Sequence, residues 1–139
     1  ILMGGSVTAI TPQHPYQPLL TRYGTPDPAL VDQVIRHEMH ERAFRLTQRR
    51  TVAETDDSAT PGPQTSIFEL CQAELEKETS NLKALLRGTQ GLGWEGDGFS
   101  HDEVASARDW LSIKRRSIAR GSNEIQMNII AKRVLGLPD

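Results

Sequence analysis

Two stretches of the sequence combine residue types that could bind a phosphate or another anion. The first is RGTQGLGWEGDGF, which contains Gly88, Gly91, Gly93, Gly96 and Gly98. Glycines allow backbone N–H groups to approach an anion closely. The stretch lacks the lysine of a P-loop and is expected to follow a helix rather than a strand, so it matches neither a P-loop nor a Rossmann fingerprint. Its composition favours a flexible connector between helices and leaves phosphate binding as the alternative.

The second stretch is RGSNE, residues 120–124. A glycine and a hydroxyl at the start of a helix could face an anion, because the N-terminal end of a helix carries partial positive charge. An ordinary N-cap is the simpler interpretation, and the residues by themselves favour it.

No metal site and no nucleophilic set is predicted. His37 and His40 have a helical spacing that can share a ligand, but no third ligand is implied, so we expect both on the surface. His14 and His101 are scattered. The single Cys71 excludes an intrachain disulfide and falls on an apolar helix face, where we expect a small buried hydrophobe.

These residues must be positioned by helices, because apolar residues recur at helical spacing and no strand pattern is convincing. Helices are predicted over about 27–52, 66–88, 100–121 and 122–135. Their start signals are Asp27 before Pro28, and two capping boxes that begin at Ser66 and Ser100. The last helix is predicted to stop at Gly136. Short connections between amphipathic helices give an all-α, antiparallel four-helix bundle over residues 27–139.

Residues 1–26 are predicted to form an irregular N-terminal arm. Pro12, Pro15 and Pro18 exclude a continuous helix there, and a short helical turn is expected before Gly24.

Composition excludes several classes of function. With 139 residues and a net charge of −2, the chain suits one domain and gives no electrostatic case for binding nucleic acid or anionic lipid. No run approaches the ~20 apolar residues of a membrane span, and no signal peptide is visible, so a cytoplasmic protein is expected. The hydrophobic fraction of 37% is low. Either the domain completes its burial against another surface, or it is simply a polar small domain.

The last twenty residues resemble a known family. RGSNEIQMNIIAKRVLGLP, residues 120–138, is similar to the terminal signature of acyl-CoA dehydrogenases, in which a Gly-(Thr/Ser)-x-Glu-Ile-Gln stretch runs into Asn-Ile-Ile-Ala-x-Arg-Val-Leu-Gly-Leu-Pro. PGPQTSIFEL, residues 61–70, and LLRGTQGLGWEGDG, residues 85–98, resemble a helix start and a glycine-rich stretch of bacterial members. The order and spacing agree from Thr21 to the end.

The resemblance implies a four-helix C-terminal domain of a larger subunit that binds FAD between subunits of a homo- or hetero-oligomer. In that family a carboxylate removes the α proton of an acyl-CoA and the β hydrogen passes as hydride to the flavin, which gives a trans-2-enoyl-CoA. The resemblance assigns cofactor-binding roles to Gly121, Ser122 and Glu124. It implies that Gly88, Thr89 and Gly91 form the glycine-rich turn that approaches the adenine end of FAD from the neighbouring subunit.

Two residues depart from the family pattern. Leu85 stands where many members have a glutamine, and Arg120 stands where many have the catalytic glutamate. Arginine cannot act as the base, because its pKa lies above about 12. Either the base lies further upstream, or the chain belongs to a non-catalytic subunit, as in heteromeric dehydrogenases of bacterial steroid side-chain breakdown. The rival hypothesis is a structural or interaction bundle that has lost the cofactor and partners a catalytic subunit. Arg120 itself would either pair with a phosphate or carboxylate, or be solvated.

Overall fold

The computed structural model describes residues 15–54, 64–119 and 121–138, in which every regular element is a helix and no strand occurs. The elements in chain order are α1 (Gln17–Tyr23), α2 (Pro28–Glu54), α3 (Gln64–Leu86), η1 (Gly88–Leu92), α4 (His101–Ser112), η2 (Ile113–Arg115), α5 (Arg116–Ala119), α6 (Asn123–Ile129) and η3 (Ile130–Val134). The all-α class predicted from the sequence is therefore confirmed.

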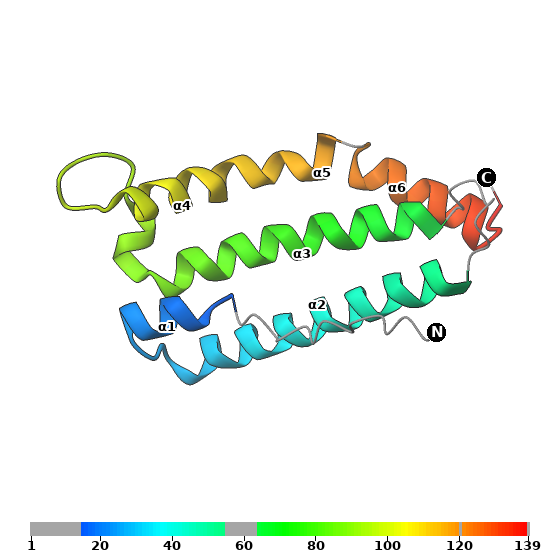
Figure 1. The fold of residues 1–139 in the computed structure, drawn as a ribbon. Helices are drawn as coiled ribbons and strands as arrows, with labels where there is room; N and C mark the ends of the chain where they lie inside the picture. Colours follow the sequence, from blue (N-terminus) through cyan, green and yellow to red (C-terminus); the bar gives the residue numbers. More distant parts are fainter. Residues whose placement is uncertain (1–14, 55–63, 120, 139) are drawn as a thin grey trace, which may run out of the picture.

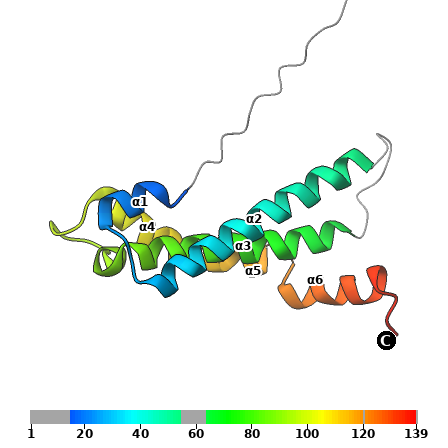
Figure 2. The ribbon, with the colours of Figure 1, turned by 90° about the horizontal axis from the view of Figure 1, so that it is seen from below.

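Helix α3 is the middle of three antiparallel layers. Figure 1 shows α1 and α2 on one side of α3, and the line formed by α4, α5 and α6 on the other. Seen from below, α2 crosses α3 at an angle, and α6 lies near the half of α3 that comes first in the chain (Figure 2). The four predicted helices correspond to α2, α3, α4 with α5, and α6 with η3, and each of them packs against α3.

Local capping chemistry sets two of the helix starts as predicted. The Asp27 carboxylate accepts a hydrogen bond from the Ala29 backbone N–H at 2.7 Å. Ser100 and Glu103 form a complete capping box, in which the Ser100 hydroxyl accepts from Glu103 N and the Glu103 carboxylate accepts from Ser100 N. The capping box predicted at Ser66 is wrong, because α3 already begins at Gln64 and Ser66 lies inside its first turn.

The third and fourth helices are less regular than predicted. Between α4 and α5 the backbone tightens into the 3₁₀ turn η2, and after α6 it widens into the π-helical turn η3. Gly136 follows with a φ of +65°, the left-handed conformation that ends a helix and that glycine adopts without strain. The predicted stop at Gly136 is confirmed.

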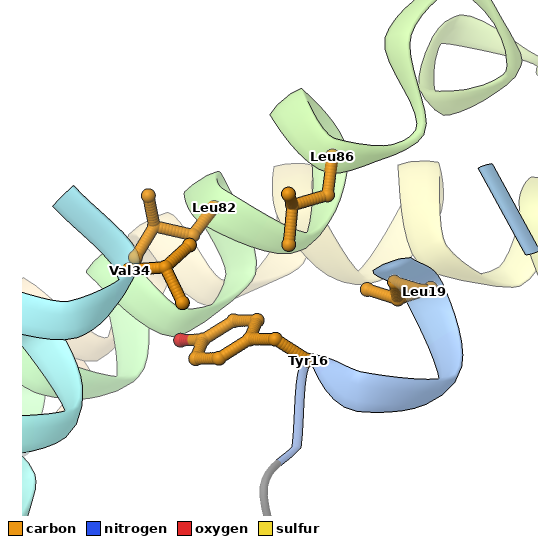
Figure 3. Close-up of a cluster of buried hydrophobic side chains, with 5 residues drawn as sticks. All are labelled: Tyr16, Leu19, Val34, Leu82 and Leu86. Carbon is orange, nitrogen blue, oxygen red and sulfur yellow. The ribbon is translucent and has the colours of Figure 1, made fainter. Parts of the chain in front are cut away.

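The core is a small cluster where α1, α2 and α3 meet. Figure 3 shows its five side chains, which are Tyr16, Leu19, Val34, Leu82 and Leu86. The expected helical turn before Gly24 is thus a two-turn helix, and it places Tyr16 and Leu19 in the core.

Many large apolar side chains remain exposed around this small core. They lie on α2, around η1, on α4 and α5, and along α6 and η3, and include Ile35, Met39, Leu46, Leu92, Trp94, Leu111, Ile118, Ile125, Met127 and Leu135. Exposed apolar surface on this scale is typical of proteins that bind other protein surfaces. Cys71 was predicted to be buried, but it is exposed, because it lies on the narrow strip of α3 that no neighbouring helix covers.

Candidate functional site

The predicted cofactor contacts near the C-terminus gather at the head of α6. Gly121 has a φ of +92°, and a Cβ there would lie 3.0 Å from the side-chain nitrogen of Gln126. Ser122 is the N-cap of α6, and its hydroxyl accepts a hydrogen bond from Ile125 N at 3.4 Å. A hydrogen bond from Ser122 lowers the pKa of the Glu124 carboxyl. Arg120 lies outside the described residues.

Polar contacts fix this segment to α3. The Asn123 amide donates to Glu74 Oε1 at 2.6 Å, and Lys77 Nζ donates to the same oxygen at 2.6 Å. The hydrogen bond from Lys77, with that from Asn123, lowers the pKa of Glu74. Seven residues before Asn123, the Arg116 guanidinium makes a two-pronged contact with Glu76, at 2.5 and 3.0 Å. The head of α6 therefore sits at a defined place beside residues 74–77.

The predicted glycine-rich contacts lie just beyond the C-terminal end of α3. Gly88 has a φ of +55° and opens the 3₁₀ turn η1. Gly91 is buried, and a Cβ there would come within 2.4 Å of the Ala84 carbonyl oxygen. Because only glycine permits this approach, the stretch folds back on α3 as an ordered turn rather than as a flexible connector. Thr89, between the two glycines, is exposed.

Two side chains beside this turn bear on what it could bind. Leu85 is 48% exposed and offers no polar group at the position where the resemblance expects a glutamine. Arg87 donates from Nη1 to the Lys83 carbonyl at 2.9 Å, while its Nε is buried and has no hydrogen-bond partner among the described residues. The buried Nε is out of reach of a ligand, but the positive charge of Arg87 beside the glycine turn favours an anion there.

The two segments do not meet within one chain. The head of α6 contacts Glu74, and η1 begins fourteen residues further along α3 at Gly88. At a rise of 1.5 Å per residue this separates them by about 20 Å. In Figure 1 the turn η1 lies at the end of α3, whereas the head of α6 lies beside the middle part of α3.

A buried polar cluster joins α2 to α3, and the sequence did not indicate it. His37 was predicted to be on the surface, but it is 4% exposed. Its Nε2 lies 2.9 Å from the Thr79 hydroxyl and 3.5 Å from Glu41 Oε1. The prediction failed because Thr79, 42 residues away in sequence, becomes a partner of His37 only when α2 packs against α3. With the ring so deeply buried, the cluster fixes the helix pair and does not face a substrate.

A second cluster joins α1 to α4 around the buried carboxylate of Glu103. The Tyr23 hydroxyl donates to Glu103 at 2.6 Å, the Ser100 backbone N–H donates at 2.7 Å, and Arg22 lies 3.6 Å away. The Tyr23 hydrogen bond, followed by the one from Ser100 N, lowers the pKa of Glu103 to about 2. A carboxyl held so firmly ionised is a poor proton acceptor at neutral pH, so this cluster is structural.

Neither a cluster of potential metal ligands nor a membrane-spanning helix is found among the described residues. Within residues 15–54, 64–119 and 121–138, no three histidine, cysteine or acidic side chains are grouped as metal ligands would be. None of the helices in these ranges is long and apolar enough to span a membrane.

Residues 21–135 match the family model described as "Acyl-CoA dehydrogenase, C-terminal domain". The chain is also 35% identical over 108 residues to "Acyl-CoA dehydrogenase IpdE1" from Mycolicibacterium smegmatis. That match covers 77% of this chain and 26% of the relative, so the chain corresponds to about a quarter of the length of the curated protein. No solved structure matches the chain.

Proposed function

The chain belongs to the acyl-CoA dehydrogenase family, of which it has the C-terminal helical domain, and we propose that it contributes to an FAD site shared between subunits of a larger enzyme. That enzyme would oxidise the α,β carbon–carbon bond of an acyl-CoA thioester. The chain spans 26% of its relative, so the activity is a property of a complete assembly rather than of these residues alone.

The observation that carries this proposal is the ordered head of α6. Gly121, Ser122 and Glu124 resemble the family's cofactor-binding pattern in sequence, and the contact between Asn123 and Glu74 holds this segment against α3. The separation of this segment from Gly88 by about 20 Å is expected if each contacts a different FAD across a subunit interface.

The chemistry of the glycine turn fits the anionic part of FAD. A Cβ at Gly88 would meet nothing within 4 Å, so a ligand could approach the backbone closely there. Arg87 supplies a positive charge beside the turn, where its Nη1 donates to the Lys83 carbonyl. These features suit a pyrophosphate, whereas Leu85 contributes no hydrogen bond to it.

When bound, FAD would supply the hydride acceptor of the reaction. The residues of this chain would hold the cofactor: the Ser122 hydroxyl and the Glu124 carboxylate at one segment, and Arg87 with the backbone of residues 88–91 at the other. The catalytic base would come from elsewhere in the assembly, because Arg120 cannot accept the α proton.

A charge placed at the N-cap of α6 tests this proposal. In the full-length protein with its natural partner, Ser122→Asp preserves helix capping but brings a negative charge towards the cofactor. We expect flavin affinity to fall roughly tenfold, which corresponds to about 1.4 kcal/mol, measured as flavin absorbance per protein after gel filtration.

Asn128→Asp is the matched control, because it adds the same charge to an exposed position on the same helix. The control should retain flavin. If both variants keep the flavin of the unmodified protein, the head of α6 does not contact the cofactor. If the unmodified assembly carries no flavin at all, the rival function applies, in which the bundle is a non-catalytic partner subunit; the substitutions at Leu85 and Arg120 favour that rival.

A further inference from the structure

The turn between α5 and α6 is tied to α3 at both of its ends by carboxylates. On the α5 side, the Arg116 guanidinium makes its two-pronged contact with Glu76. On the α6 side, the Asn123 amide donates to Glu74 at 2.6 Å. Between these contacts lies Gly121, whose φ of +92° is a conformation that glycine adopts without strain. The residues of the proposed cofactor contact therefore lie at a turn that is held on both sides.

The two carboxylates approach the turn from opposite flanks of α3. Glu74 and Glu76 are two residues apart, so they point in directions about 160° apart around the helix. Ala73 lies within this arc and is 7% exposed, so the covered face of α3 passes between the two carboxylates. A segment held from both flanks cannot shift across α3 or rotate without breaking one of the contacts.

Apolar packing contributes little to the placement of α6. Among residues 123–134, all of which the structure describes, none is fully buried, and Ile125 and Met127 are 55% and 53% exposed. The Glu74 carboxylate is itself held, because Lys77 donates to the same oxygen as Asn123, at 2.6 Å. Polar contacts with α3, rather than a buried core, therefore set where the head of α6 lies.

We propose that Glu74 and Glu76 are positioning residues for the flavin site. They hold the turn so that the head of α6, with the Ser122 hydroxyl and the Glu124 carboxylate, is directed at the cofactor. Neither positioning residue touches the flavin, and each acts through the side chain that it holds. This inference rests on the proposed function. Misplacement by ~1 Å at a reacting centre can cost ~100-fold in rate, so a small rotation of α6 would matter.

Asn123→Asp tests the contact on the α6 side. The change sets two carboxylates against each other where the structure has a hydrogen bond. An aspartate in the first turn of a helix is by itself favourable, because it faces the positive end of the helix dipole. Only the contact with Glu74 therefore predicts a loss. In the full-length protein with its natural partner, after removal of flavin, the amides of residues 121–129 should exchange roughly fivefold faster, while those around Leu82 stay unchanged.

A swap of the two groups identifies Glu74 as the partner. In the double variant Asn123→Asp with Glu74→Gln, the amide lies on α3 and the carboxylate on α6, so a donor again faces an acceptor. Exchange should then return to the rate of the unmodified protein. Glu74→Gln alone should loosen the turn less than Asn123→Asp, because its amide oxygen still accepts from Asn123. Asn128→Asp, the matched control on an exposed position of α6, should leave residues 121–125 unchanged.

The contact on the α5 side is tested by a charge exchange. Arg116→Glu should speed exchange of the same amides, because it removes a two-pronged ion pair and places two carboxylates together. Addition of Glu76→Arg should recover most of the protection. A double variant that exchanges as fast as Arg116→Glu would show that Glu76 does not hold the turn.

Flavin binding links the position of the turn to the cofactor. In the full-length assembly, Asn123→Asp should lower flavin affinity roughly fivefold and shift the reduction potential of the flavin that stays bound. The double variant with Glu74→Gln should restore both. It still carries a carboxylate at position 123 but has the net charge of the unmodified protein, so recovery reflects the position of α6 rather than charge. A contact that only stabilised the fold would leave the potential of bound flavin unchanged.

Ser122→Asp separates failure of this inference from failure of the proposed function. Unchanged exchange in Asn123→Asp, or no recovery in the double variant, would overturn the positioning role. The role is also overturned if exchange rises and recovers but flavin does not respond, although Ser122→Asp releases it. If flavin responds to neither Asn123→Asp nor Ser122→Asp, the proposed function fails and the positioning role with it.

Discussion

Removal of the hydroxyl group from each of the two tyrosines should change the stability of the fold in opposite directions. Tyr16 is 1% exposed, and its buried hydroxyl faces Thr79, which lowers the Tyr16 pKa less than burial raises it; the contact lacks the geometry of a normal hydrogen bond. Tyr23 donates its hydroxyl to the buried carboxylate of Glu103 at 2.6 Å. Replacing each by phenylalanine removes one hydroxyl and leaves the ring. We expect Tyr16→Phe to stabilise the fold and Tyr23→Phe to destabilise it.

The magnitude for Tyr16 follows from its unsatisfied hydroxyl. Burial raises the pKa of Tyr16 far above its ordinary value, which shows how poorly its surroundings solvate the group. A buried polar group without a partner costs about 1–3 kcal/mol. Because Tyr16→Phe leaves a small gap beside His37, we expect a net gain of about 1 kcal/mol, or about 4 °C in Tm. Tyr23→Phe leaves Glu103 without its shortest hydrogen bond, so the urea midpoint should fall.

Urea unfolding at neutral pH, followed by the fluorescence of Trp94 and Trp110, measures both variants with the same probes. Neither substitution alters these reporters. The reasoning about Tyr16 is refuted if Tyr16→Phe lowers the urea midpoint as Tyr23→Phe does, since its hydroxyl would then have a partner in solution.

Further predictions concern pH, packing, the glycine turn and activity. Glu103 has a folded-state pKa of about 2, below the ~4.3 of an unfolded glutamate. The ionised Glu103 carboxylate should therefore stabilise the fold fully above about pH 4.3 and lose this effect as the pH falls towards 2. In Glu103→Gln the urea midpoint should depend less on pH over that interval. Leu82→Ala, at a fully buried position, should lower the free energy of unfolding by about 3 kcal/mol in the same assay, and a loss below about 1 kcal/mol would contradict the assigned core. Gly91→Ala should destabilise more than Gly88→Ala in thermal melts, because only the Gly91 Cβ collides with a backbone atom, the Ala84 carbonyl; equal losses would argue against the close approach. The 139-residue chain alone should not reduce an artificial acceptor with any acyl-CoA thioester, and turnover above a heat-killed control would disprove this.

Features set by neighbouring residues were predicted best. The Asp27 cap, the capping box at Ser100 and the stop at Gly136 each depend on a few consecutive residues, and the structure contains all three. Ser66 carries the same capping pattern as Ser100, yet α3 begins before it. A capping pattern thus identifies a residue able to cap a helix, but the residues upstream decide whether the helix has already started.

Features that depend on packing were missed. His37 is buried because Thr79 and Glu41 satisfy it, and nothing near His37 in the sequence indicates a partner on another helix. Cys71 has apolar neighbours along α3, so the sequence pattern places it on a buried face. Other helices cover most sides of α3, and the pattern of apolar residues does not show which narrow strip stays exposed.

The candidate site was predicted as two short segments, and the structure describes where they lie relative to α3. Their roles towards FAD remain predictions for Gly121, Ser122 and Glu124, and likewise for residues 88–91. Their separation could not be read from either motif, because it depends on where the head of α6 docks along α3, through Asn123 and Glu74.

The polar contacts between the C-terminal half of α2 and α3 affect local unfolding of the protein. Beyond Phe44, the residues of α2 on its α3 side are Gln48 and Thr51, which release little apolar surface when they separate from α3. In amide hydrogen exchange, the C-terminal half of α2 should therefore lose protection in a local opening that leaves α3 and its Leu82 core intact. A neighbouring surface that held this half of α2 in place would slow its exchange even if it left the contacts between α2 and α3 unchanged.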